Sequence, residues 1–310
     1  MSDNISFEEL FEQAIEYPEV DYRERLDRLV GLDAQKEQLS KTLGLLVNPD
    51  GLSEWVEKYH KGANSVKDIV LRRPPLIVMA GDVGSGKTEL AMTIGDSVAR
   101  LEGIGITLLP MSLSTRGDGR VGQMTKLISK AFEYTLERAK KLKGETGKSR
   151  GAVILLVDEA DALAQSRENA QMHHEDKSGV NAFIRGIDSL GNGKLPAAVI
   201  MCTNRPSALD PAVKRRAAEV FYFKRPNEEQ RYEVLASPLK ELGITENEIQ
   251  QLVKITGATD GRDYGFTYSD LLQRLIPTII ISAYPGKAVS GELAIGVAEE
   301  MIPTPVFKEK

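Results

Sequence analysis

Five short apolar runs alternate with amphipathic stretches through the middle of the chain. Each run has the length of a buried strand, and the runs are residues 76–80, 106–113, 153–157, 198–202 and 220–223. Between them, apolar residues recur every three or four positions, which predicts helices; the clearest examples are residues 90–101, 124–139 and 180–190. Apolar strands separated by helices are typical of parallel sheets. The pattern therefore predicts an α/β fold: a five-stranded parallel sheet with helices on both faces.

The strand pattern stops after Pro226. Residues 227–298 show helical spacing, and the stretch from Leu271 to Tyr284 is apolar nearly all round. We expect this stretch to be buried. We also expect a break at Pro277, because proline removes a backbone donor and disrupts helix interiors. A small all-helical lid domain is therefore predicted after the α/β domain.

The start of the chain has a weaker pattern. Residues 7–28 mix acidic residues with Phe, Leu and Tyr, which indicates short helices on a surface. A helix is predicted from about Asp33 to Leu46. Together the patterns predict three parts: an N-terminal helical segment (1–30), a large α/β domain (31–226) and a small helical domain (227–310).

Composition narrows the function classes. Of 310 residues, 40 are Lys or Arg and 45 are Asp or Glu; the net charge of −5 argues against broad electrostatic binding to nucleic acid. Cys202 is the single cysteine, so no intrachain disulfide can form, which fits a reducing compartment. The first residues lack a secretory pattern, and no apolar run is long enough to cross a membrane. We therefore expect a soluble cytoplasmic protein.

A glycine-rich loop follows the first apolar run and precedes a predicted helix. Its sequence is Gly81-Asp82-Val83-Gly84-Ser85-Gly86-Lys87-Thr88. Glycines let the backbone wrap closely and aim N–H groups at phosphate oxygens, and the helix N-terminus adds partial positive charge. Lys87 can reach the β- and γ-phosphates, and the Thr88 hydroxyl can ligate Mg²⁺. The loop therefore predicts a triphosphate site.

Two carboxylates, Asp158 and Glu159, end the third apolar run. In a parallel sheet the strand ends meet at one edge, where ligands bind in this class of fold. Asp158 would hold Mg²⁺ through water, and Glu159 would orient and deprotonate the attacking water. Taken alone, the pair would be two solvated charges that begin a loop; the phosphate loop about seventy residues upstream favours the functional interpretation.

The glycine-rich loop and the acidic pair, with one strand and one helix between them, resemble the nucleotide-binding motifs of AAA+ ATPases. The resemblance implies ATP hydrolysis with Mg²⁺ and makes Glu159 the catalytic glutamate. Asn204, after the fourth apolar run, resembles the sensor-1 residue, which hydrogen-bonds the attacking water or the γ-phosphate. In isolation, residues 204–206 are simply a turn.

The segment Leu209–Arg216 resembles the part of these ATPases that carries arginine fingers. A finger from a neighbouring subunit offsets charge on the transferring phosphoryl group. Arg215 falls at the first finger position; Ala218 occupies the usual second position, and whether Arg216 acts in its place is open. The alternative is a basic surface turn. The finger interpretation implies a homo-oligomeric ring, with six subunits expected.

Weaker matches lie outside these motifs. Val30 and Gly31 resemble the segment that packs on adenine, although an ordinary hydrophobic turn fits the residues equally well. Residues 265–271 resemble the lid motif, whose sensor-2 position falls near Ser269, where many members have arginine. The assignment stays open, and the arginines that could substitute are Arg262 and Arg274.

The predicted substrate contacts depart from the usual pattern. Arg120, Val121 and Gly122 align with the first pore loop, which usually has an aromatic before Val-Gly. An aromatic grips extended chain through contact area, so Arg120 puts processive threading in doubt. Residues 167–177 would form the second pore loop. They include His173 and His174, but no other ligand lies at suitable spacing, so a solvated loop is favoured over a metal site.

The compact single-ring layout and the helix around Asn181–Asp188 are similar to bacterial relatives of the pachytene-checkpoint ATPases. Those relatives remodel HORMA-domain proteins, often beside a nucleotide-second-messenger synthase in antiphage defence. The resemblance implies that this protein pulls a HORMA protein from its closed, partner-bound state and so switches signalling off. Two alternatives are a general AAA unfoldase or chaperone, and a DNA-associated helicase-loader-type switch, which the negative charge disfavours.

Overall fold

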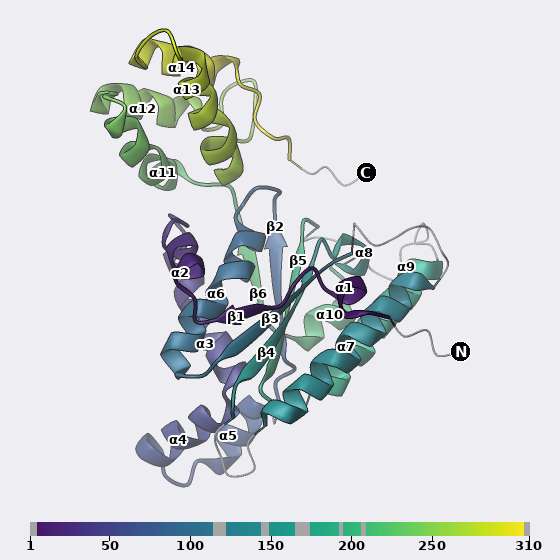
Figure 1. The fold of residues 1–310 in the computed structure, drawn as a ribbon. Helices are drawn as coiled ribbons and strands as arrows, with labels where there is room; N and C mark the ends of the chain where they lie inside the picture. Colours follow the sequence, from purple (N-terminus) through teal and green to yellow (C-terminus); the bar gives the residue numbers. More distant parts are fainter. Residues whose placement is uncertain are drawn as a thin grey trace. The chain divides into compact units, whose positions relative to one another are not determined.

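The computed structural model describes residues 5–113, 122–143, 149–164, 174–191, 195–205 and 209–306. Its contacts divide the chain into two compact units (Figure 1). The first unit consists of Met1–Asp27, Ala34–Ala80 and Thr88–Tyr222, and the second of Arg28–Asp33, Gly81–Lys87 and Phe223–Lys310. Among the described residues, no helix is both long and apolar enough to cross a membrane.

The first unit is built on one sheet with the strand order β1-β3-β4-β5-β2-β6. The strands are β1 (Ile15–Tyr17), β2 (Leu76–Gly81), β3 (Ile106–Ser112), β4 (Ala152–Asp158), β5 (Ala197–Thr203) and β6 (Ala217–Phe223). The pairs β3–β4, β4–β5 and β2–β5 are parallel. The five predicted runs are thus confirmed as strands. Their apolar character follows from position, since β2 and β5 are buried at every residue.

The prediction of five parallel strands missed β1, which pairs antiparallel with the edge of β3. The N-terminal segment is also not confined to the surface, because Phe11 is fully buried and Tyr17 nearly so. A strand of three residues is too short to show an alternating apolar pattern. Acidic residues near Phe11 and Tyr17 also make the segment polar on average, so the burial of these two aromatic side chains was not predicted. The Tyr17 hydroxyl donates to the Met92 carbonyl, which anchors the strand.

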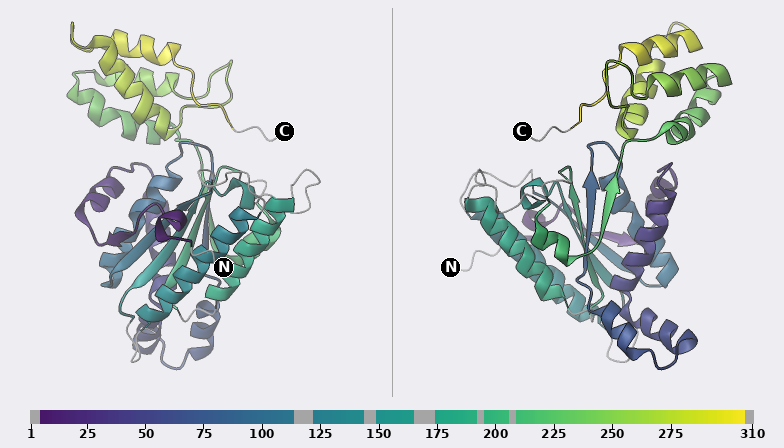
Figure 2. Two further views of the ribbon diagram at one scale, coloured as in Figure 1. Left: turned by 45° about the vertical axis from the view of Figure 1, so that its right-hand side comes forward. Right: turned by 180° about the vertical axis from the view of Figure 1, so that it is seen from behind.

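Helices cover both faces of the sheet, as predicted: α3 and α6 lie on one face, and α7 and α9 on the other (Figure 1, Figure 2). Phe132 of α7 and Phe183 of α9 meet edge to face with ring centroids 5.6 Å apart. The bounds in this part of the chain are α1 (Phe7–Leu10), α2 (Val20–Asp27), α3 (Asp33–Val47), α4 (Pro49–Tyr59), α5 (Asn64–Leu71), α6 (Lys87–Glu102), α7 (Gln123–Leu142), α8 (Asp161–Ala164), α9 (His174–Leu190) and α10 (Pro211–Arg216).

The second unit contains a helical bundle, as predicted. Its helical segments are α11 (Glu228–Glu241), α12 (Glu246–Ile255), the π-helix η1 (Asp270–Leu275), α13 (Ile276–Ala283) and α14 (Gly291–Glu300). Capping boxes begin α11 and α12, where Asn227 pairs with Gln230 and Thr245 with Glu248.

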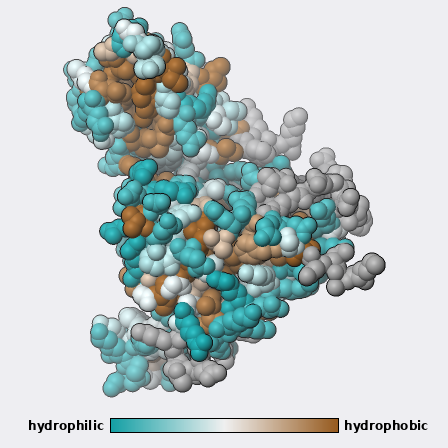
Figure 3. Space-filling model, viewed as in Figure 1, coloured by the Kyte–Doolittle hydropathy of each residue, from teal (hydrophilic) through white to brown (hydrophobic). Residues whose placement is uncertain are grey.

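Two expectations about the stretch from Leu271 to Tyr284 are wrong. The helix continues through Pro277, because the Ile276 N–H donates to the Leu271 carbonyl five residues earlier, and this π-turn widens the helix where proline lacks a donor. Burial is confined to the face of Leu271, Leu275 and Ile279, whereas Ile281 is 72% exposed. A small bundle can bury only one face of this helix. Figure 3 shows apolar side chains gathered on the surface of the helical unit.

Candidate functional site

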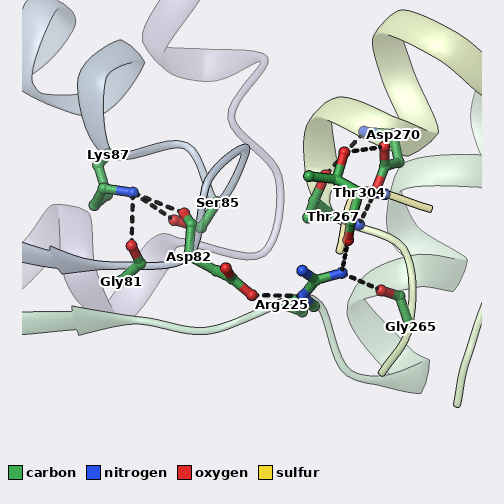
Figure 4. Close-up of polar contacts among 9 residues, drawn as sticks. All are labelled: Gly81, Asp82, Ser85, Lys87, Arg225, Gly265, Thr267, Asp270 and Thr304. Carbon is green, nitrogen blue, oxygen red and sulfur yellow. Dashed lines mark hydrogen bonds and ion pairs between the residues drawn. The ribbon is translucent and has the colours of Figure 1, made fainter. Parts of the chain in front are cut away.

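The glycine-rich loop lies in the second unit and folds around the Lys87 ammonium group. Gly84 and Gly86 have φ values of +72° and +91°, a backbone region that side chains other than glycine rarely adopt. Lys87 is only 5% exposed. Its Nζ donates to the carbonyls of Gly81 (3.0 Å) and Asp82 (2.7 Å) and to Ser85 Oγ at 3.4 Å (Figure 4). The loop thus holds a cation at its centre, with Val83 partly exposed beside it.

Residues of the predicted lid motif contact this loop. The Ser269 N–H donates to the Gly84 carbonyl at 3.1 Å. A Cβ atom at Gly84 would lie 2.7 Å from Thr267 Oγ1 and 2.9 Å from Ser269 Cβ, so only glycine fits here. The phosphate loop and the lid motif are therefore in direct contact within the second unit.

Thr88 and Asp158, the predicted Mg²⁺ ligands, are in contact within the first unit. The Thr88 hydroxyl donates to Asp158 Oδ1 at 3.3 Å, which joins the start of α6 to the end of β4. The same carboxylate oxygen accepts from the Glu159 N–H at 2.8 Å. Carboxylate and hydroxyl oxygens are ligands that Mg²⁺ accepts, so the pair fits the predicted ion.

Glu159 is exposed and has a φ of +51°, the only positive value for a non-glycine residue in the described ranges. Such a backbone costs about 1–3 kcal/mol and persists only where its surroundings impose it. Here the N–H of Glu159 is bound to Asp158, and the next N–H, of Ala160, donates to the Cys202 carbonyl at 3.0 Å. The positive φ thus marks a strained turn directly after β4, with Glu159 exposed at its start.

Asn204 is held by a residue that the sequence analysis missed, Asp161 at the start of α8. Asp161 Oδ1 accepts from the Asn204 N–H at 2.7 Å and from the Thr203 hydroxyl at 2.8 Å, and its Oδ2 accepts from the Asn204 amide at 3.3 Å. The sequence does contain this further acid three positions after Asp158. No local pattern links Asp161 to Asn204, so the contact could not be predicted. Asp161 therefore positions the predicted sensor residue.

The two predicted finger arginines differ in their surroundings. Arg215 is exposed and forms no ion pair among the described residues. Arg216 binds Asp188 of α9 with two contacts, of 2.7 Å and 3.0 Å, and this hydrogen bonding raises the pKa of Arg216. Of the two arginines, Arg216 is paired with Asp188 in a partly exposed ion pair, whereas Arg215 is exposed.

Comparison with known proteins agrees with this geometry. Residues 77–225 match the family model described as ATPase family associated with various cellular activities (AAA). The chain is 63% identical over 305 residues to CD-NTase-associated protein 6 of Escherichia coli strain MS 115-1, covering 98% of each chain. The chain belongs to the AAA ATPase family. Nucleotide binding and ATP hydrolysis are therefore its activities, and the family and the fold predicted from the motifs are confirmed.

Two solved structures are similar to this ATPase along nearly its whole length. It matches a chain of the Escherichia coli MS115-1 HORMA:CdnC:Trip13 complex with a TM-score of 0.89, at 62% identity and with 98% and 99% of the two chains covered. It also matches the structure of Rhizobiales Trip13, with a TM-score of 0.73 at 55% identity over 96% of this chain and all of that one.

The segment predicted to contact adenine lies in the second unit of the ATPase. The Gly31 carbonyl accepts from the Gln230 side-chain amide at 2.7 Å, and Gly31 has a φ of +74°. A Cβ there would lie 2.9 Å from the Tyr268 hydroxyl, whose pKa is raised to about 12 by burial. Val30 is partly exposed beside this contact. The segment is packed on the helical bundle, and its contact with adenine stays a prediction.

The two arginines considered for the sensor-2 role bind groups of the bundle. Arg274 donates to Asp270 at 2.6 Å and to the Ile302 carbonyl at 3.1 Å. Arg262 donates to the carbonyls of Ile255 and Gly257. The hydroxyl of Ser269 donates to Gln273 at 2.8 Å. Each of these side chains thus has a partner inside the second unit.

The predicted pore loops fall largely outside the described residues. Arg120 and Val121 are not described, and Gly122 stands at the N-terminus of α7 with a φ of +83°. Most of residues 167–177, including His173, also lie outside the described ranges. His174 begins α9.

Proposed function

We propose that this AAA ATPase uses ATP hydrolysis to remodel a HORMA-domain protein that acts with a nucleotide-second-messenger synthase in antiphage signalling. The observation that carries the proposal is the close match, along nearly the whole of both chains, to a chain of the HORMA:CdnC:Trip13 complex. By this proposal, the ATPase converts the HORMA protein from its closed, partner-bound state and switches signalling off.

The site residues have distinct proposed roles. Backbone N–H groups from Gly81 to Gly86, with Lys87, bind the polyphosphate, which replaces the loop oxygens around the Lys87 ammonium. Thr88 and Asp158 hold Mg²⁺, which when bound offsets phosphate charge. Glu159 takes a proton from the attacking water, and Asn204, fixed by Asp161, orients that water or the γ-phosphate.

We also propose a ring, of six subunits, in which Arg215 reaches the site of the neighbouring copy. Its exposure and its lack of an ion-pair partner within the described chain support this role, because a finger must be available to another subunit. The pairing of Arg216 with Asp188 argues that Arg216 supports the helix that carries Arg215. We further propose the domain limits of 1–30, 31–226 and 227–310.

Arg120, Val121 and Gly122 are proposed to contact the client at the centre of the ring. With arginine in place of an aromatic, the loop suits brief pulling on a polar or acidic segment better than long threading. We place the ATPase in the cytoplasm, where ATP is available.

The test uses Glu159→Gln, with the wild type and the exposed Glu299→Gln as controls. We expect Glu159→Gln to bind ATP but to lose turnover by about a hundredfold or more, since removing a general base costs about 10²–10⁴ in rate. The variant should also fail to release a purified HORMA protein from its synthase, as followed by size-exclusion chromatography. Glu299→Gln should release it normally.

Three results would contradict parts of the proposal. Undiminished turnover in Glu159→Gln would remove this residue from the mechanism. Release of the HORMA protein without turnover would separate remodelling from ATP hydrolysis. A wild type that hydrolyses ATP and unfolds an unrelated protein, but leaves the HORMA complex intact, would support a general unfoldase instead.

A further inference from the structure

The phosphate loop carries a negative charge of its own. Asp82 lies directly after Gly81, and its carbonyl is the acceptor that Lys87 approaches most closely, at 2.7 Å. An aspartate at this position places a carboxylate in the same short loop that must bind a polyphosphate. Like charges repel, and the repulsion is strong where water is partly excluded. Unless it is neutralised, this carboxylate opposes ligand binding.

Arg225 neutralises it. Its Nε lies 2.6 Å from Asp82 Oδ2, and the two side chains are only 11% and 16% exposed. Asp82 is the carboxylate partner of Arg225 among the described residues, so the charges match one to one. The guanidinium also stands over the ring of Tyr264, 4.9 Å from its centroid. The pair is sheltered, and screening by solvent is weaker than for a surface pair.

The same guanidinium is fixed from the helical bundle. Its Nη1 donates to the carbonyls of Gly265 and Thr304, each at 2.7 Å. Thr304 in turn donates through its N–H and hydroxyl to Asp270, which is fully buried. Asp270 also accepts from the Thr267 N–H, and Thr267 borders Gly84 of the phosphate loop. Figure 4 shows these contacts leading from the loop through Arg225 into the bundle.

We infer that Arg225 is a positioning residue for nucleotide binding: it cancels the charge of Asp82 in the phosphate loop and holds that carboxylate against the helical bundle. The inference rests on the proposed ATP site and adds a specific electrostatic requirement to it. The loop is then gripped at two points, at Asp82 by Arg225 and at Gly84 by Ser269. Loss of the arginine charge leaves a carboxylate that repels phosphate.

The test compares ADP binding by calorimetry in Arg225→Met, Asp82→Asn and the double variant. Arg225→Met should raise the Kd about tenfold, equivalent to about 1.4 kcal/mol. Asp82→Asn should lower the Kd, because it leaves the arginine charge uncompensated beside the phosphates. The double variant should return to within about threefold of the wild type, and added salt should shrink the defect of Arg225→Met.

A support role without the charge effect predicts a different pattern: both single variants bind more weakly, and the double variant stays as weak as Arg225→Met. Weaker ADP binding by Asp82→Asn, or a double variant that binds as weakly as Arg225→Met, would overturn the inference. Arg231→Met is the matched control, because Arg231 is a buried arginine of the same unit whose acceptors, among the described residues, are the carbonyls of Val253 and Pro226. Arg231→Met should lower the thermal unfolding midpoint but leave the Kd for ADP close to that of the wild type.

Two points keep the test decisive. If Arg225→Met does not fold, as judged by thermal unfolding without nucleotide, Arg225→Lys keeps the positive charge but loses the planar guanidinium. Its Kd for ADP should therefore rise by less than the roughly tenfold expected for loss of the charge. Asp82→Asn still shows whether removing the carboxylate lowers or raises the Kd for ADP. If the wild type itself binds no ADP, the proposed function fails; if the wild type binds and Asp82→Asn binds more weakly, only this inference fails.

Discussion

At the scale of single residues, the described site depends on acids that position other groups. Asp161 accepts three hydrogen bonds from Thr203 and Asn204, and at least the N–H contact of 2.7 Å is short enough to count as charge-assisted. A carboxylate accepts at both oxygens, whereas an amide accepts at one only. The orientation of Asn204 therefore depends on the charge and symmetry of Asp161.

We predict that Asp161→Asn lowers kcat for ATP by about tenfold to a hundredfold, since misplacement of a catalytic group by about 1 Å costs this much. The Kd for ADP should stay within about twofold, because Asp161 does not belong to the phosphate loop. Steady-state kinetics and calorimetry measure the two effects. Asp260→Asn, at an exposed position of the helical unit, is the control. Equal losses of affinity and rate would contradict a positioning role.

The sequence predicted the residues of each motif but not their partners. Gly84, Lys87, Asp158 and Glu159 are recognisable because their chemistry requires particular residue types at fixed spacing. The contact of Asp161 with Asn204 joins positions 43 residues apart. No local pattern encodes such a contact, because it depends on how the strands are ordered in the sheet.

At the scale of elements, a buried acid with several hydrogen bonds lies at the start of η1. Asp270 is fully buried and accepts from Thr267, Thr304 and Arg274. Burial by itself would raise the pKa of Asp270, but the hydrogen bonds outweigh it and lower the pKa below its ordinary value. The ionised form therefore stabilises the junction of η1 with the residues after α14.

We predict that Asp270→Asn destabilises the helical unit by about 2–4 kcal/mol at neutral pH, because an amide N–H would face donors in a buried site. Since the folded pKa is lowered, the contribution of Asp270 is present above the unfolded pKa of about 4 and is lost as the pH falls through the folded value. Thermal unfolding of the two proteins at pH 7, 5 and 3 should show the difference shrinking only in acid. A difference that stays constant to pH 3 would argue against the carboxylate.

Elements with long periodic patterns were predicted well, and short or unusual ones were not. The five strands and the helices between them have enough residues for their burial to appear in the sequence. The strand β1 has only three residues, too few to show a repeat. The helices α4 and α5 do have apolar residues at helical spacing, such as Leu52, Trp55, Val56 and Tyr59, but no prediction was made for that stretch. The π-turn before Pro277 depends on one shifted backbone hydrogen bond, which no side-chain pattern records.

At the scale of the whole molecule, the proposed role of the exposed Arg215 divides the reacting groups between two copies of the chain. By the proposed function, each site takes Glu159 from one subunit and Arg215 from the next. Two inactive variants that damage opposite sides of the shared site can then restore each other, which is a property of a ring and not of a monomer.

We predict that Arg215→Ala and Glu159→Gln, each nearly inactive alone, recover turnover when mixed in equal amounts. Random assembly would give about one quarter of the interfaces an intact glutamate and an intact finger, so turnover should approach about a quarter of the wild-type value. The measurement is phosphate release after co-assembly. Lys214→Ala with Glu159→Gln serves as the control pair, since exposed Lys214 neighbours the finger. A mixture no more active than its parts would contradict the proposal that Arg215 acts at the site of the neighbouring subunit.

The antiparallel strand β1 has a consequence for how the chain behaves before it is fully folded. It covers the outer edge of β3, whose backbone N–H and C=O groups would otherwise be open to any passing strand. A sheet without that cover invites edge-to-edge pairing between copies, and the apolar residues of β3 would follow the backbone into the aggregate. The short strand β1 thus covers the start of β3, from Ile106 to Leu108, and we expect that shortening the chain past Tyr17 would expose this part of the edge and favour aggregation.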